Sequence, residues 1–293
     1  DLFGRAAWQL RTRAGVRVFA WLPVMAFDIP DQRLLVTSWD PAGNTLRVDP
    51  HQPRRLSPWN PEARRIITEI YADLSRHATF GGILFSDDAL LSDFEDAAPE
   101  PLGGFARFLG RQSEATLTVP QIRADPELFA QWSRYKSRFL IELTDELHRI
   151  VESYQGSVLS ARNLFALPVL QPEASTWFAQ DLSEFLDAYD QVALMAMPYM
   201  EAAEHPSEWL QQLLNAVAAV DGALDQVVFE FQSVDWRTPG KRVPSDELAA
   251  TMRRFQRSNA IHFGYYPDDF HNNHPDATII HPAFSLQWYP FEQ

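Results

Sequence analysis

Five carboxylates are crowded into a short run that directly follows a predicted buried strand. The strand is Gly81–Phe85, and the run after it, residues 86–96, is called the acidic loop; its carboxylates are Asp87, Asp88, Asp93, Glu95 and Asp96. Glycosidic bonds are cleaved by paired carboxylic groups, one protonating the leaving oxygen and one attacking or stabilising the anomeric carbon. Crowding in a partly dry cleft raises the pKa of at least one carboxyl, which can then act as an acid near neutral pH. The spacing therefore favours glycoside cleavage or the binding of a cationic ligand.

Two other interpretations of the acidic loop do not involve catalysis. Closely spaced aspartates can bind Ca²⁺ through oxygen ligands, but Ala89 and Leu91 stand where an EF-hand needs ligands, and no central glycine is present. A simply solvated acidic loop remains the main alternative on spacing alone.

Other reaction chemistries find little support in the sequence. The eight histidines show no His-Glu-x-x-His spacing, and His271–His274 reads as a polar turn. No Gly-x-Ser-x-Gly elbow or Walker loop occurs. Cysteine is absent, which excludes disulfides and thiolate catalysis. We therefore expect no cofactor and no bound metal.

The charge and the aromatic content indicate the kind of ligand. The formal net charge of −14 disfavours nucleic acid and anionic lipid and favours a cationic partner, although acidity can also serve solubility alone. Nine Trp exceed the needs of a core of this size, and Trp faces can stack on the apolar faces of sugar rings. No apolar run reaches the ~18 residues of a membrane span.

Strand-like and helix-like segments alternate along the chain. The predicted strands are Val16–Val24, Leu34–Thr37, Gly81–Phe85, Leu159–Leu170, Val192–Met197, Val227–Phe231 and Ala260–Tyr266. The predicted helices are Leu2–Arg13, Pro61–His77, Asp125–Tyr154, Glu173–Tyr189, Ser207–Val220 and Asp246–Gln256. This alternation predicts an α/β fold, either a (β/α) barrel or an open doubly wound sheet. The first strand lacks a Gly-rich fingerprint, so we expect one TIM-barrel-like (β/α)-barrel domain over residues 1–293, with eight or fewer canonical units.

Several predicted strands end in polar or aromatic groups. Beside Asp87 and Asp88 these are Tyr199 with Glu201, Gln232 with Trp236, and Tyr265 with Tyr266. A barrel gathers the carboxyl ends of its strands at one mouth, so these groups are candidate ligand contacts. Arg162 lies inside a strand, where its charge needs a partner, and we expect an ion pair with the acidic loop. Trp177 and Phe178 are a further candidate stacking surface.

Five blocks of the sequence resemble a known family. They are residues 7–16, 82–96, 161–169, 195–199 and 264–270, which read AWQLRTRAGV, GILFSDDALLSDFED, ARNLFALPV, MAMPY and GYYPDDF. Together they resemble the C-terminal glycoside hydrolase domain of PgaB-type poly-β-1,6-N-acetyl-D-glucosamine N-deacetylases, across essentially the whole chain. The resemblance implies a barrel-like hydrolase domain acting on partly deacetylated polymer, whereas deacetylation belongs to an N-terminal domain that this chain lacks.

The resemblance also implies roles for particular residues. The family's acidic loop corresponds to Asp87, Asp88, Asp93 and Glu95, which we expect to be catalytic, with Asp93 or Glu95 as the general acid. Tyr199, Glu201, Arg162, Tyr265 and the family's aromatic contacts at Trp177, Phe178 and Trp236 are expected to bind substrate. Ser86 departs from the family, where we expect His.

Function and cellular setting follow as expectations. The expected activity is endo-acting cleavage of partly deacetylated poly-β-1,6-N-acetyl-D-glucosamine, a biofilm exopolysaccharide; the alternative is a non-catalytic module that guides the polymer to export. The first residues lack an initiator Met and a signal peptide, so we expect the chain to be part of a longer, two-domain precursor. That protein is expected in the periplasm, held at the outer membrane through its missing N-terminus, with an export porin as a partner.

Overall fold

The computed structural model describes residues 2–48, 53–111 and 117–284. The chain divides into two compact units: unit 1 holds residues 1–162 and 171–189, and unit 2 holds residues 163–170 and 190–293. Each unit is described by itself. The expectation of a single domain stays a prediction.

Unit 1 is built on three parallel strands in the order β1-β4-β5. Its strands are β1 (Phe19–Leu22), β4 (Gly82–Phe85) and β5 (Leu159–Leu164), the last of which ends in unit 2; β2 (Ser38–Asp40) and β3 (Thr45–Arg47) form a separate antiparallel hairpin. Its α-helices are α1 (Leu2–Gln9), α2 (Pro61–His77), α3 (Pro99–Phe108), α4 (Val119–Ala124), α5 (Pro126–Gln155), α7 (Ser175–Phe178) and α8 (Leu182–Ala188). Short helical turns occupy η1 (Leu10–Ala14), η2 (Gln32–Leu34) and η3 (Pro172–Ala174).

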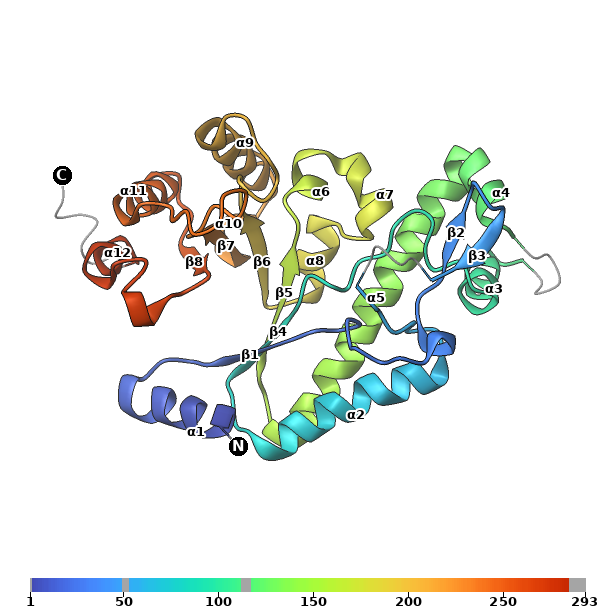
Figure 1. The fold of residues 1–293 in the computed structure, drawn as a ribbon, viewed down its shortest axis with the longest axis horizontal. Coiled ribbons are helices and arrows are strands. Elements are labelled where there is room, and N and C mark those ends of the chain that lie inside the picture. The colour runs from blue at the N-terminus through green and yellow to red at the C-terminus, as the bar shows by residue number, and fades with distance from the viewer. Residues whose placement is uncertain (1, 49–52, 112–116, 285–293) are drawn as a thin grey trace. The chain divides into compact units, whose positions relative to one another are not determined.

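The two long helices of unit 1 begin with strong caps. The Asn60 side chain accepts from the amides of Glu62 and Ala63 at the start of α2, and Pro61 occupies the first turn. Asp125 caps α5 in the same way, and Gly156 ends it at φ 75°, where a side chain would be strained. α2 and α5 lie side by side (Figure 1), and Tyr71 of α2 stacks on Phe85 of β4.

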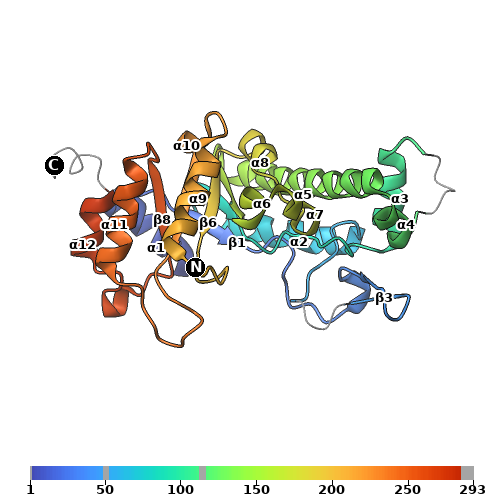
Figure 2. The same cartoon turned by 90° about the horizontal axis from the view of Figure 1, so that it is seen from above.

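Unit 2 continues the same strand–helix alternation with the parallel order β6-β7-β8. Its strands are β6 (Gln191–Ala196), β7 (Val227–Gln232) and β8 (His262–Tyr266). Its helices are α6 (Leu167–Leu170), α9 (Pro206–Ala218), α10 (Ala223–Gln226), α11 (Ser245–Gln256), η4 (Phe270–Asn272) and α12 (Ala277–Phe284). α11 and α12 lie side by side in both ribbon views (Figures 1 and 2).

Several predicted boundaries are wrong. The strand expected over Leu159–Leu170 ends at Leu164, and its last residues form α6, where Pro168 fits the first turn of a helix. The helix expected over Glu173–Tyr189 is broken at Ala179, which has φ 52° and ends α7. The strand expected at Leu34–Thr37 falls on the last residue of η2 and on the irregular segment that follows it.

The sequence also gave no sign of α3 and α4, which gather at the N-terminal end of α5 (Figures 1 and 2). Both helices bury apolar side chains in one cluster with Trp132 of α5. Gly103 and Gly104 lie inside α3 and lower its intrinsic helix propensity, so packing rather than propensity forms this helix.

Candidate active site in the acidic loop

Alternation along the strands decides which side chains of unit 1 face the helices. Phe85, the last residue of β4, stacks on Tyr71 of α2 with ring centroids 6.0 Å apart. Arg162 is the register partner of Phe85 and points to the same, helix-covered side. The next residue, Asn163, therefore faces the opposite side of the sheet. The acidic loop starts directly after Phe85, at the carboxyl end of β4.

Asp88 is bound to the backbone of the segment after β1. Its carboxylate accepts hydrogen bonds from the amides of Val24 at 2.9 Å, Met25 at 2.6 Å and Ala26 at 2.5 Å. Burial raises the pKa of Asp88, and these amide bonds work in the opposite direction. Asp88 thus ties the acidic loop to the neighbouring strand end.

Glu95 lies in a buried ion pair. Its carboxylate is 2.8 Å from Nη2 of Arg55, and both side chains are about 95% removed from solvent. It also accepts from the amide of Ser92 at 3.1 Å. Asp96 is buried as well and accepts from the Ser57 hydroxyl at 2.6 Å. Both carboxylates hold the far end of the loop in place.

Asp93 is paired with Arg123 of α4. The guanidinium of Arg123 also lies over the ring of Phe94, 3.9 Å from its centroid. The Asp93 side chain is 18% exposed, so the ion pair with Arg123 lies close to the surface.

Asp87 differs from these four carboxylates. It is half-buried, and its carboxylate accepts a hydrogen bond from the hydroxyl of its neighbour Ser86 at 2.9 Å. Within the described ranges, no Lys, Arg or His nitrogen lies within 4.0 Å of it. Asp87 is therefore the acidic-loop carboxylate best placed to meet a ligand.

The ion pair expected between Arg162 and the acidic loop is wrong. Arg162 is fully buried, and its guanidinium donates to the carbonyl oxygen of Ala89 at 2.7 Å and to the Tyr189 hydroxyl at 2.8 Å. It also lies over the ring of Phe185, 4.4 Å from the centroid. Arg162 supports the loop backbone from the helix side of the sheet, and its expected contact with substrate stays a prediction.

The segment of Trp177 and Phe178 contacts the acidic loop. The carbonyl oxygen of Phe178 accepts from the amide of Leu91 at 3.4 Å. Trp177 is 41% exposed. Unit 1 therefore brings an exposed indole, on the segment that touches the loop, into the same part of the fold as Asp87.

In unit 2 the strand alternation separates Tyr265 from Tyr266. Tyr265 packs on Phe284 of α12, with centroids 5.9 Å apart, on the helix side. Tyr266 pairs in register with Gln232, is 44% exposed, and lies 6.2 Å from the ring of Trp236. The exposed aromatic pair of unit 2 is thus Trp236 with Tyr266, and Tyr265, the predicted contact, belongs to the packing.

The loop that carries Trp236 is firmly fixed. Asp235 accepts from Nε and Nη2 of Arg237 at 2.9 and 3.0 Å, and from Nζ of Lys241 at 3.0 Å. The Arg237 guanidinium holds the pKa of Asp235 well below its usual range. Trp236 is held between these two paired residues.

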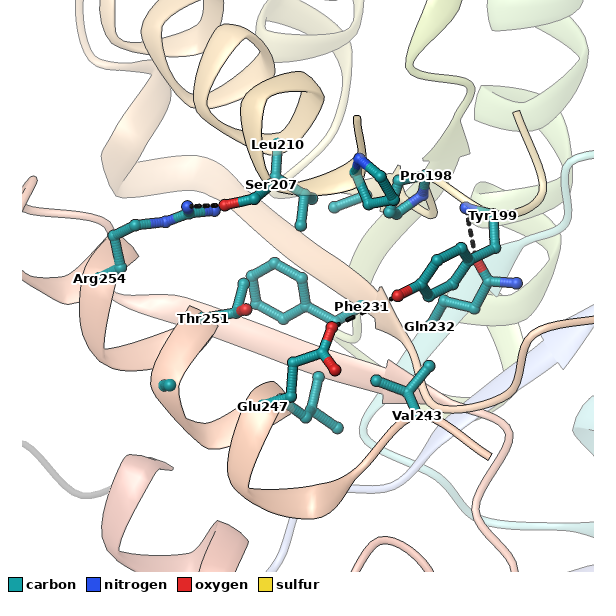
Figure 3. Close-up of a pocket in the computed structure, with 14 residues that line it drawn as sticks. Pro198, Tyr199, Ser207, Leu210, Phe231, Gln232, Val243, Glu247, Thr251 and Arg254 are labelled. Carbon is teal, nitrogen blue, oxygen red and sulfur yellow. Dashed lines mark hydrogen bonds between the residues drawn. The ribbon is translucent and has the colours of Figure 1, made fainter. Parts of the chain in front are cut away.

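Tyr199 lines a pocket of about 310 Å³ between α9 and α11 (Figure 3). Its hydroxyl donates to Glu247 at 3.3 Å, and its amide donates to the side chain of Gln232 at 3.1 Å. Arg254 lies at the other end of the pocket and donates to Ser207 at 2.8 Å. Glu201, two residues after Tyr199, is half-buried, and this burial raises the pKa of its carboxyl.

Glu230 is a candidate that the sequence analysis does not include. It lies on β7, between Phe229 and Phe231, which both pack on Phe255 of α11; Glu230 therefore points to the other face. There it accepts from Nδ2 of Asn163 at 2.8 Å. A single charged residue within an otherwise apolar predicted strand is the signal that could have found it.

The described residues contain neither a cluster of metal ligands nor a membrane-spanning helix. No three His, Asp or Glu side chains among them are grouped so that they could hold a metal ion. None of the helices described above combines the length and apolarity needed to cross a membrane.

A family model described as hypothetical glycosyl hydrolase family 13 matches residues 1–266. The chain belongs to this family. A solved relative, the PgaB (BpsB) glycoside hydrolase domain from Bordetella bronchiseptica, is 46% identical; the match covers 98% of this chain and 80% of that one, with a TM-score of 0.87. The resemblance to the PgaB-type glycoside hydrolase domain is confirmed.

The curated relatives are longer proteins. The poly-β-1,6-N-acetyl-D-glucosamine N-deacetylase of Escherichia coli K12 is 43% identical over 296 residues, which is 99% of this chain and 43% of that protein. The chain therefore spans less than half the length of this curated relative.

More distant structures show the fold alone. A β-galactosidase from Rahnella sp. R3 (TM-score 0.63, 12% identity) matches 99% of this chain and 48% of its own. Gan42B, a β-galactosidase from G. stearothermophilus (TM-score 0.62, 14% identity), matches 95% and 47%. The predicted α/β, TIM-barrel-like glycosidase architecture is confirmed, with six parallel strands in the described residues rather than eight.

Proposed function

We propose that this glycoside hydrolase domain cuts partly deacetylated poly-β-1,6-N-acetyl-D-glucosamine at internal linkages, at its acidic loop. The family and the Bordetella structure support a hydrolase, and the name of the E. coli relative supplies the polymer. The net charge of −14 supports a ligand that carries free amines. Exposed aromatic rings at Trp177, Trp236 and Tyr266 suit the apolar faces of sugar rings.

The observation that carries the assignment is the surroundings of the Asp87 carboxylate, which accepts from the Ser86 hydroxyl and, within the described ranges, has no cationic nitrogen within 4.0 Å. Cleavage of a glycosidic bond needs a carboxyl group that protonates the leaving oxygen, and a second carboxylate or the substrate's own 2-acetamido group takes the other role. Asp88 is occupied by three backbone amides, and Asp93 and Glu95 by arginines, so these three fix the loop. Asp87 remains as the group that meets the scissile linkage. In this proposal neither Asp93 nor Glu95 is the general acid that the sequence predicts. Both instead position the acidic loop.

The proposal is tested by product analysis. Purified wild-type chain is incubated with partly deacetylated polymer, and products are sized by mass spectrometry at early times. Internal cleavage predicts a spread of oligosaccharide lengths from the first time point. Asp87→Asn is expected to abolish these products while polymer binding, followed by calorimetry, stays close to wild type.

The matched control is Asp145→Asn, since Asp145 is an exposed α5 carboxylate paired with Arg149 one turn away. It should leave product formation unchanged. Binding without any shortened product from the wild type would instead identify a polymer-guiding module and refute the hydrolase.

The cellular setting belongs to the same proposal. Acting on an exported polymer, the full-length protein would work in the periplasm at the outer membrane, beside an export porin. Fractionation of cells that express the full-length protein tests this placement, and recovery with cytosolic markers would contradict it.

A further inference from the structure

The backbone of the acidic loop is held by three buried cations from three separate parts of unit 1. Arg162 of β5 donates to the carbonyl oxygen of Ala89 at 2.7 Å. Arg55, which precedes α2, donates to the carbonyl oxygen of Leu90 at 2.5 Å. Both side chains are at most 4% exposed. These contacts reach backbone atoms, so they fix the path of the loop rather than any one of its side chains.

Lys136 of α5 is the third cation, and it makes two such contacts. Its Nζ donates to the carbonyl oxygens of Ser92 at 2.5 Å and Glu95 at 3.0 Å. The side chain is fully buried, and Nζ lies 5.2 Å from the ring centroid of Trp132 on the same helix. Lys136 thus joins α5 to the far end of the loop through two carbonyls, and that of Ser92 also accepts from the amide of Glu95 at 3.0 Å.

Charged groups surround Lys136 on several sides. Glu95 and Asp96 of the loop favour its charged form, whereas Arg123 of α4 and burial oppose it. Burial is the largest of these effects and lowers the pKa of Lys136 to about 7. Glu95 is already neutralised by Arg55, so it gives Lys136 less support than an unpaired carboxylate would.

We propose that Lys136 is a positioning residue for Asp87: it fixes the acidic loop through the carbonyls of Ser92 and Glu95, and the loop loosens when Lys136 loses its proton. The ammonium has three N–H donors and satisfies both carbonyls by charge-assisted bonds. The neutral amine has two donors and a lone pair, which weakens both contacts. The catalytic part of this inference rests on the proposed hydrolysis at Asp87.

The test compares Lys136→Met, Lys136→Arg and the control Arg138→Met, a change on the exposed side of the same helix. Hydrogen exchange of the peptide covering residues 86–96, followed by mass spectrometry, reports the loop itself and needs no substrate. Lys136→Met should speed its exchange by about tenfold, with the rest of unit 1 and the circular dichroism spectrum unchanged. Arg138→Met should exchange like the wild type.

Activity gives a second readout that a merely structural role would not produce. In the wild type, kcat should fall as the pH rises through about 7. Lys136→Arg keeps its charge, so it should retain activity and lose this alkaline fall. Lys136→Met should be about tenfold slower in kcat at every pH, because a misplaced group costs rate even when the substrate binds.

The outcomes separate the two proposals. Unchanged exchange of residues 86–96 in Lys136→Met refutes the positioning role, whether or not the chain cleaves the polymer. If exchange changes as expected but wild type yields no product, the hydrolysis proposal fails while the hold on the loop stands. An alkaline fall that persists in Lys136→Arg refutes the dependence on the Lys136 proton. If Lys136→Met does not fold, the pH dependence of exchange at residues 86–96 tests the proposal instead. Exchange should quicken above about pH 7 in the wild type and not in Lys136→Arg; equal pH dependence in both would refute the proposal.

Discussion

The buried pair of Arg55 and Glu95 offers a quantitative test of how the acidic loop is held. Arg55→Met removes the 2.8 Å ion pair with Glu95 and the 2.5 Å bond to the Leu90 carbonyl. Glu95 would then stay buried as an anion that accepts only from the amide of Ser92. Breaking such a pair from one side typically costs about 3–5 kcal/mol. We therefore expect Arg55→Met to lower the free energy of unfolding of unit 1 by roughly that amount.

A double variant isolates the charge. Arg55→Met with Glu95→Leu leaves no buried anion, so what remains is chiefly the unsatisfied Leu90 carbonyl, about 1–3 kcal/mol. Urea unfolding followed by circular dichroism measures both variants, with Arg138→Met as the exposed control. A cost below about 1 kcal/mol for Arg55→Met, or a double variant as costly as the sum of its parts, would refute the reasoning.

Further predictions concern stability against pH and the aromatic surface. The pKa of Lys136 is lowered from 10.5 to about 7, so the unfolded chain binds a proton that the folded chain lacks between these values. The free energy of unfolding should therefore rise with pH across this window, by at most about 1.4 kcal/mol per pH unit. Lys136→Met should remove this rise when the free energy is measured by urea unfolding at several pH values. A rise of the same slope in the variant would contradict the prediction. Trp236→Ala and Tyr266→Ala should each weaken polymer binding by about tenfold in calorimetry, whereas Tyr265→Phe should leave it unchanged. Loss of binding in Tyr265→Phe would reverse the assignment of the two faces of β8.

The fold class could be predicted from the sequence because strand-like and helix-like segments alternate, and the long elements show clear apolar periodicity. The predicted helix Pro61–His77 matches α2 at both ends, since Asn60 and Pro61 are explicit start signals. α3 was missed because its helix propensity is weak and its stability comes from the cluster around Trp132. Such tertiary support leaves no local pattern in the sequence.

The acidic loop could be located from sequence, but the roles of its members could not. Asp87, Asp88, Asp93 and Glu95 look alike as a run of carboxylates. Their differences come from partners far along the chain: Val24 for Asp88, Arg123 for Asp93 and Arg55 for Glu95.

The two faces of β8 raised a related problem. Tyr265 and Tyr266 are adjacent tyrosines, and only the register with β7 shows which of them lies beside Trp236. A shift of the β7–β8 register by one residue would place Tyr265 on the exposed face and Tyr266 on the packed face.

The most direct test of the central claim is hydrolysis in ¹⁸O-labelled water. If the chain cleaves the polymer at Asp87, each cut made by the wild type places one ¹⁸O at the reducing end that it creates, and Asp87→Asn yields no labelled product while still binding polymer. Labelled products formed by Asp87→Asn at the wild-type rate would contradict the account.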